Sequence, residues 1–233
     1  MRTGSRTLLI AFALLATLSA PSNALEIFGN TGLGNAGRQF GTDSLQYTQL
    51  AQGFTMGSNS YQLSSVVLGL NFGNPVPNSS EILVSLFDDN GSNLPGTQIG
   101  TFNTGSPNPA FAADGRNEYT FNYSGTTTLT AGSKYWVVVQ NIPTSPVFDW
   151  WYASGNPSDD PSAKNSSGVT YLGTRGTLNG DGSSWSRNLA ATGSNIRYTV
   201  NVVPEPSTYA LGLAGTLVLG TIARRRNRQA ITA

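Results

Sequence analysis

The 233-residue chain contains no cysteine and no histidine. Their absence excludes disulfides, a cysteine nucleophile, a Ser-His-Asp triad and the usual zinc sites. A Ser-Lys catalytic pair would need Lys134 or Lys164, and neither lies in a recognisable motif. A protein without disulfides depends on its hydrophobic core, and the roughly 180 residues between the two ends of this chain are enough to form one. Carboxylate chemistry is the main catalytic option that remains.

Charge is also scarce once the two ends of the chain are set aside. Thirteen basic and twelve acidic residues give the whole chain a net charge of +1. Six of the basic residues and one acid, Glu205, lie outside residues 25–203, which leaves 7 − 11 = −4 for that segment. No basic patch remains there, so we expect no nucleic-acid partner.

The first 24 residues have the layout of an export signal. Two arginines precede an apolar run from Leu8 to Leu18, and the small residues Ser22 and Ala24 follow it. The run is shorter than the roughly 20 apolar residues that span a bilayer. We therefore predict a signal peptide over residues 1–24, cleaved after Ala24 by signal peptidase once the export machinery has engaged it. The alternatives are cleavage after Ala20 and a short membrane anchor.

Residues 25–203 alternate apolar and polar side chains in short runs and show no helical period of useful length. Asn-Gly and Asp-Gly pairs separate the runs and supply the positive φ angles of tight hairpins. This pattern predicts one all-β domain, an antiparallel β-sandwich or jelly roll. Tyr135 to Val139 is typical of a more deeply buried strand. The expected core positions of the other runs are Val66, Leu68, Leu70 and Phe72; Ile82, Val84 and Leu86; Tyr119, Phe121 and Tyr123; Phe148, Trp150 and Tyr152; and Ile196, Tyr198, Val200 and Val202.

The aromatic run from Phe148 to Tyr152 suggests a ligand contact. With Trp150 among the core residues, the next residue, Trp151, faces outward beside Asp149, because successive strand residues alternate in direction. An exposed indole stacks on a sugar ring while a carboxylate accepts its hydroxyls. Trp151 and Asp149 are therefore the candidate glycan contact, the alternative being an isolated surface tryptophan.

Two groups of oxygen-bearing residues resemble calcium ligands in type. Asp88, Asp89 and Asn90 form one, and Asp181 lies in the other. Neither group has the spacing of an EF-hand, and both occupy sequences typical of hairpin turns. We therefore predict no metal and no cofactor, and retain these residues only as weak calcium candidates.

A glycosidase would need two carboxylates about 5 to 9 Å apart in a cleft. Most of the acids stand beside Gly, Asn or Pro, where turn chemistry explains them better, so we do not expect an enzyme. The candidates for such a pair are Asp88, Asp89, Asp114, Glu118, Asp149, Asp159, Asp160 and Asp181.

Several short segments within residues 40–155 resemble the sequences of the choice-of-anchor R family. They are Ala51-Gln52-Gly53-Phe54, Leu63-Ser64-Ser65-Val66, Ser85-Leu86-Phe87-Asp88 followed by Leu94-Pro95-Gly96, and the run Leu129 to Val139. The resemblance implies an extracellular β-rich domain ahead of an anchor, and leaves the molecular function open.

The last 30 residues form a separate segment. Pro204, Glu205 and Pro206 precede fifteen mostly apolar residues, Tyr209 to Ala223, and then a basic cluster. As a helix, fifteen residues reach roughly 22 Å, so we expect a short transmembrane helix with help from snorkelling arginines. The positive-inside rule makes Arg224, Arg225 and Arg226 the orientation signal, with that end cytoplasmic.

The order of these parts resembles the PEP-CTERM sorting signal, with Pro204, Glu205 and Pro206 as the motif. The resemblance implies that an exosortase, a membrane protease-transpeptidase, recognises the motif and detaches the tail. The alternative is a plain C-terminal anchor. We therefore expect an exported, non-enzymatic protein that is membrane-bound at an intermediate stage and then reaches the cell surface or extracellular matrix. A module that binds exopolysaccharide and a carboxylate-dependent glycan hydrolase are the alternatives.

Overall fold

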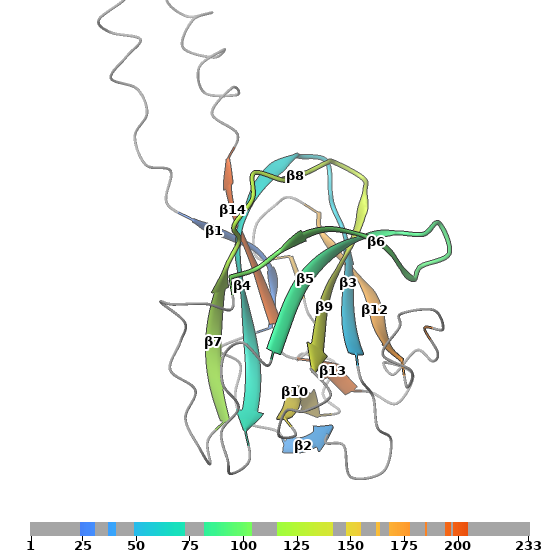
Figure 1. The fold of residues 1–233 in the computed structure, drawn as a ribbon. Helices are drawn as coiled ribbons and strands as arrows, with labels where there is room; N and C mark the ends of the chain where they lie inside the picture. Colours follow the sequence, from blue (N-terminus) through green and yellow to red (C-terminus); the bar gives the residue numbers. More distant parts are fainter. Residues whose placement is uncertain are drawn as a thin grey trace, which may run out of the picture. The chain divides into compact units, whose positions relative to one another are not determined.

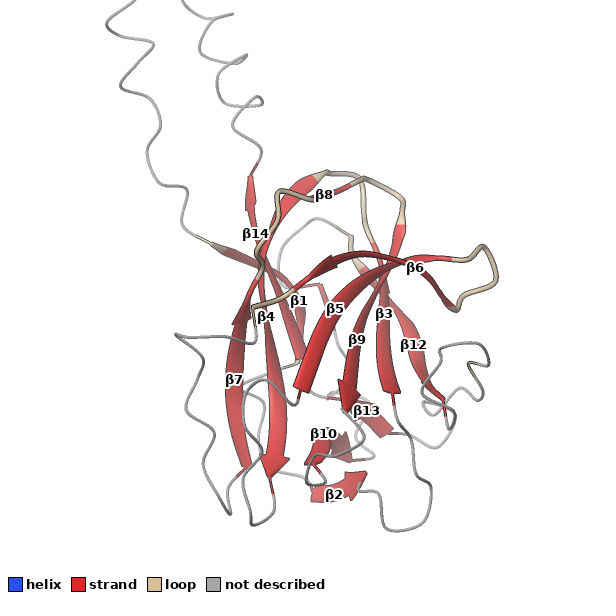
Figure 2. Ribbon diagram, viewed as in Figure 1, coloured by secondary structure: helices blue, strands red, loops and turns tan. Residues whose placement is uncertain are grey.

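A computed structural model describes residues 24–30, 37–40, 49–72, 82–103, 116–141, 148–154, 162–163, 168–177, 185, 194–196 and 198–204. Within these ranges the chain forms strands and turns and no helix (Figure 2). The strands make two antiparallel sheets, so the predicted all-β class is confirmed for this part. One compact unit spans Ala24–Val203. The predicted signal peptide and tail helix lie outside the described residues.

The larger sheet has nine strands (Figure 1). β7 (Arg116–Asn122) and β8 (Thr128–Leu129) pair with β4, and β2 (Gly37–Phe40) pairs with β10. The main path of neighbouring strands is β11 (Ser162–Ala163), β1 (Leu25–Gly29), β14 (Tyr198–Pro204), β4 (Tyr61–Phe72), β10 (Phe148–Ser154) and β13 (Ser194–Ile196).

The smaller sheet has five strands in a single path. Its central strand pairs with neighbours on both sides, Val138 lying opposite Ala51 on one side and opposite Ser85 on the other. In order, the strands are β12 (Thr170–Thr177), β3 (Gln49–Thr55), β9 (Lys134–Asn141), β5 (Ile82–Asp89) and β6 (Pro95–Thr101).

The main core combines side chains from the two sheets. Phe28 of β1 lies 6.1 Å, ring centre to ring centre, from Phe54 of β3, and 5.6 Å from Tyr198 of β14. The predicted core positions whose side chains the structure describes are buried, apart from Tyr123, which is half-buried. The period-two patterns therefore identified the inward face of β4, β5, β7 and β14 correctly. Phe72, Phe148, Trp150, Tyr152 and Ile196 were also predicted, and their side chains lie outside the described part.

β9 is buried on both faces, as its continuous apolar run predicts. Tyr135, Val137 and Val139 belong to the main core. Trp136 and Val138 join Ala51 in a second, smaller cluster, against which Phe87, Leu172 and Trp185 pack. Because neighbouring residues of a strand point to opposite faces, this second cluster lies on the outer face of the five-stranded sheet.

Candidate functional site

The two ends of the domain are the residues nearest to the predicted processing points. β1 begins at Leu25, directly after the predicted cleavage residue Ala24, and both residues are exposed. β14 ends at Pro204, the first residue of the predicted sorting motif. β1 therefore starts, and β14 ends, within one residue of the two predicted boundaries.

These two ends lie side by side. β1 and β14 pair antiparallel, with Leu25 opposite Val202 and Gly29 opposite Thr199. In an antiparallel pair the start of one strand adjoins the end of the other. Leu25 and Pro204 therefore leave the nine-stranded sheet at the same end (Figure 1).

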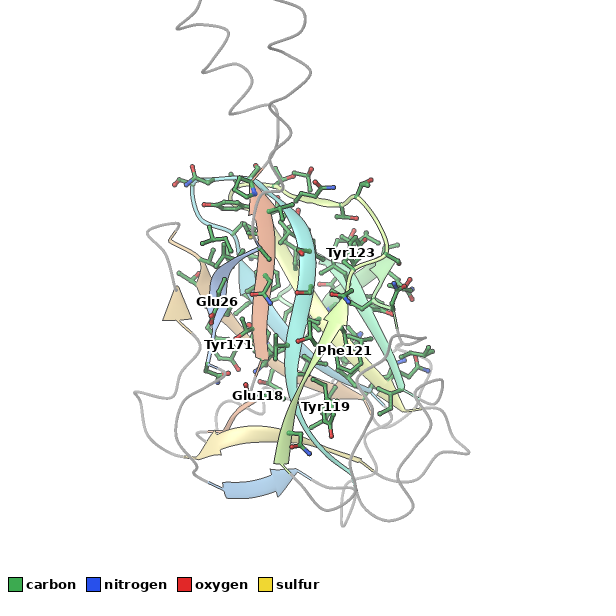
Figure 3. All side chains as sticks on the ribbon, turned by 90° about the vertical axis from the view of Figure 1, so that its left-hand side faces the viewer. Glu26, Glu118, Tyr119, Phe121, Tyr123 and Tyr171 are labelled. Carbon is green, nitrogen blue, oxygen red and sulfur yellow. The ribbon has the colours of Figure 1, made fainter. Side chains whose placement is uncertain are left out.

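Side chains fasten β14 to both of its neighbours. Asn30 accepts a hydrogen bond from the Tyr198 backbone N–H at its Oδ1 (2.9 Å) and donates its own N–H to the Tyr198 carbonyl (3.0 Å). The Thr199 hydroxyl donates to Glu26 Oε1 on β1 (3.3 Å; Figure 3). On the other side, the Asn201 amide donates to the Ser65 hydroxyl of β4 (3.1 Å). β14 is thus an interior strand held from both sides.

A close backbone approach also locks the β1–β14 pair. A Cβ atom on Gly29 would lie 2.2 Å from the Thr199 hydroxyl oxygen and 2.6 Å from the Thr199 Cα. Such distances are far below van der Waals contact, so only glycine fits at this crossing.

β14 is also a core strand. Tyr198, Val200 and Val202 are fully buried. Burial raises the pKa of the Tyr198 hydroxyl well above its usual value, because the charged phenolate would lose its hydration there. Only Val203 separates the buried Val202 from Pro204, so there is no linker between the core and the motif. Proline has no N–H to donate, and it suits the point where a ladder ends.

The acids of the β5–β6 hairpin serve the turn. Asp88 Oδ1 accepts the Thr97 N–H at 2.5 Å, and Asp89 Oδ1 accepts the Gly91 N–H at 2.8 Å. The Asn90 side chain accepts the Ser92 N–H at 2.8 Å. Among the described residues no three acids gather in a group that suits a metal ion. These oxygens thus accept N–H groups of the hairpin, while Asp181 lies outside the described residues.

Sequence reasoning missed one arrangement around Trp136. Its indole N–H donates to Asp89 Oδ2 (2.9 Å), and its ring covers Gly53, where a Cβ would lie 2.7 Å away. The Arg175 guanidinium lies 5.5 Å from the ring centre. Burial lowers the pKa of Arg175, and the nearby Tyr171 and Asp89 offset only part of this decrease. Since Trp136 is fully buried, this cluster stabilises the outer face of the sheet and offers the indole to no ligand.

The candidate glycan residues lie on β10. The register places Trp150 opposite Leu70 of β4 and Trp151 opposite Gln39 of β2. The side chains of Asp149 and Trp151 are outside the described part of the structure, so the glycan contact stays a prediction.

Comparison with known families adds evidence for the tail. The protein-family model of the PEP-CTERM protein-sorting motif matches residues 202–227. The chain carries this sorting motif. It supports export and sorting to the cell surface by a membrane-anchored exosortase. The match begins at Val202, inside β14, so the motif and the last core strand overlap.

The comparison with curated proteins leaves the domain unassigned. No curated protein matches the chain. The resemblance of residues 40–155 to the choice-of-anchor R family stays a prediction. In the described ranges no helix is long and apolar enough to cross a membrane. The apolar run Tyr209 to Ala223, together with Glu205, Pro206 and the three arginines, lies beyond those ranges.

Proposed function

We propose that the chain is a non-enzymatic surface or matrix protein whose β-sandwich is the final product of two processing steps. The observation that carries this proposal is the pairing of Leu25 with Val202. Because these residues are paired, a junction before Leu25 and a motif at Pro204 would lie at the ends of adjacent strands. Removing the segments before Leu25 and after the motif leaves every described core strand in place.

The export signal is cut before the sorting tail in this proposal. Leu25 already belongs to the β1 ladder, so the Ala24–Leu25 bond is most accessible before β1 pairs with β14. The tail enzyme acts on the motif that begins at Pro204, the last residue of β14. Signal peptidase thus acts on the unfolded chain, and the exosortase acts on the folded one.

The test replaces the motif in the full-length chain. In a host that has the sorting system, alanine at Pro204, Glu205 and Pro206 leaves a longer, membrane-retained form, detected by its gel mobility and by cell fractionation. The matched control places three alanine or serine substitutions elsewhere in the same tail, Gln229→Ala, Ile231→Ala and Thr232→Ser, and is processed normally. Normal maturation and release of the motif variant contradicts the proposal.

Exopolysaccharide binding is a second candidate, and the β10 register supports its premise. Cross-strand partners occupy the same face of a sheet, and Leu70, the partner of Trp150, is fully buried. The prediction that Trp150 belongs to the core and Trp151 to the surface is consistent with this register. Its test compares the two tryptophans and is described below.

A further inference from the structure

We propose that, while the tail is attached, the domain stands on the membrane with one end of its nine-stranded sheet against the lipid headgroups. This is the end where β1 starts and β14 ends. The inference rests on the proposed function, because it requires the run Tyr209 to Ala223 to lie in the membrane. It adds an orientation and a membrane-contact surface, which we call the β8 end and define as residues 56–62 and 124–133.

The tether from the sheet to the membrane is short. Five peptide units separate Pro204, the last residue of β14, from Tyr209, the first of the apolar run. A fully extended chain spans at most about 3.6 Å per residue, so the end of β14 stands within about 18 Å of the membrane. A small folded domain measures about 30 Å across. No such domain fits between the sandwich and the bilayer, and the facing surface is therefore the headgroup layer.

The β8 end lies beside the end of β14. β8 pairs with the first residues of β4, Tyr61 opposite Leu129 and Gln62 opposite Thr128. Figure 1 shows β8 and the end of β14 at the same end of the sheet, and the turned view in Figure 3 agrees. The hydrogen bond from Asn201 to Ser65 fixes β14 against the same part of β4.

The composition of this end suits a headgroup surface. Residues 56–62 and 124–133 contain no charged side chain, and most are Ser, Thr, Gly or Asn. An uncharged surface loses less hydration free energy than a charged one on approach to lipid. The absence of acids also avoids repulsion from anionic headgroups.

The backbone here is held in place before any contact is made. Gly132 N–H donates to the Gly57 carbonyl (2.9 Å), Met56 N–H to the Ser133 carbonyl (2.8 Å), and Ala131 N–H to the Ser60 hydroxyl (2.9 Å). Ser58, Asn59, Thr128 and Thr130 remain exposed. The surface is thus a bonded set of turns that presents hydroxyl and amide groups outward.

Among the described residues, four charged groups on neighbouring strands make side-chain hydrogen bonds. Glu26 on β1 accepts the Thr199 hydroxyl, and Lys134 at the start of β9 donates its ammonium to Asn93 Oδ1 at 2.6 Å. Asp88 and Asp89 belong to the hairpin of the other sheet and accept turn N–H groups. None of these four charges lies within the β8 end.

The chain offers a matched pair of positions to test the orientation. Thr128 and Thr120 are both exposed threonines on strands that pair with β4, opposite Gln62 and Val67 respectively. These partners are five positions apart on β4, which corresponds to about 17 Å along the strand. Because the chain has no cysteine, Thr128→Cys and Thr120→Cys each accept a single fluorescent label.

The experiment uses full-length precursor from a host without the sorting enzyme. Each labelled variant is bound to phosphatidylethanolamine–phosphatidylglycerol vesicles whose headgroups carry a nitroxide quencher, with nitroxide-free vesicles as the reference. Equal melting temperatures establish that both variants fold. We expect several-fold stronger quenching at position 128 than at position 120.

The outcomes separate the two proposals. Vesicle binding with equal quenching at both positions, or stronger quenching at position 120, overturns the orientation and leaves the proposed function standing. Failure of the precursor to bind vesicles at all overturns the membrane stage of the proposed function, and this inference with it.

Discussion

Leu25, the first residue of β1, lies directly opposite Val202, two residues before the first proline of the sorting motif. The first and the last strand of the domain are thus neighbours in its larger sheet. Loss of either strand would remove buried residues, Ile27 and Phe28 on one side and Val200 and Val202 on the other. A cut inside either strand would therefore destabilise the fold.

Gly29→Ala destabilises the domain through the β1–β14 crossing. The new Cβ would meet Thr199 and the Tyr198 carbonyl at 2.2 to 2.7 Å, and a rigid ladder cannot move aside. We expect a loss of about 3 kcal/mol in the free energy of unfolding, measured by urea denaturation of the exported protein. Gly91→Ala is the control, since it has open space and only its positive φ opposes it, at about 1 kcal/mol. Equal losses in the two variants would show that the close approach is unimportant.

Trp136 contributes through its ring and through its N–H. Trp136→Ala removes a fully buried indole and should lower the free energy of unfolding by about 3 to 5 kcal/mol. Trp136→Phe keeps a ring but leaves Asp89 Oδ2 without its donor, for a loss of about 1 to 3 kcal/mol. Ser92→Ala, at an exposed position of the same hairpin, keeps the backbone N–H that Asn90 accepts and should change the free energy of unfolding by less than about 0.5 kcal/mol. If Trp136→Phe had the same free energy of unfolding as the wild type, the hydrogen bond from the indole N–H to Asp89 would not contribute to stability.

Tyr198 makes stability fall in alkaline solution. Its pKa is raised in the folded state by burial, so above about pH 10 the unfolded chain loses a proton that the folded chain keeps. The contribution of this group is complete below the unfolded pKa and declines as the pH rises towards the folded pKa, by about 1.4 kcal/mol per pH unit. Tyr198→Phe lacks this group. Between pH 9 and 11 the wild type should therefore lose more stability than the variant, and parallel pH profiles would contradict this.

The sequence predicted the strands and their inward faces better than it predicted which strands pair with each other. Alternation in Val66, Leu68 and Leu70 is a local property, and burial followed it. The pairing of β1 with β14 joins residues about 170 positions apart, and nothing in either strand alone specifies its partner.

Of the candidate site, the sequence predicted the sorting motif but not the cluster around Trp136. The motif at Pro204 to Pro206 is a short linear pattern, so the sequence alone revealed it. The Trp136 cluster draws Gly53, Asp89 and Arg175 from three other strands, and no local pattern brings them together. The only available signal was the continuous apolar run of β9, which required a cover on the outer face of its sheet.

Trp151→Ala and Trp150→Ala test the glycan candidate. If Trp150 belongs to the core opposite Leu70, its replacement should lower the free energy of unfolding by roughly 3 to 5 kcal/mol. Trp151→Ala should keep the stability and lose binding to the host's exopolysaccharide, measured by retention on immobilised polysaccharide. Equal destabilisation by both, or binding unchanged by Trp151→Ala, would remove the residue-level case for a sugar ligand.

The most direct measurement is the intact mass and terminal sequence of the protein recovered from the surface or medium of a host that has the sorting system. We predict a chain that begins at Leu25, retains β14 through Val203, and lacks Arg224, Arg225 and Arg226. The cut then lies at or beyond Pro204, outside the ladder that holds β14. A surface protein that still begins at Met1, or that extends to Ala233, would contradict processing at that end.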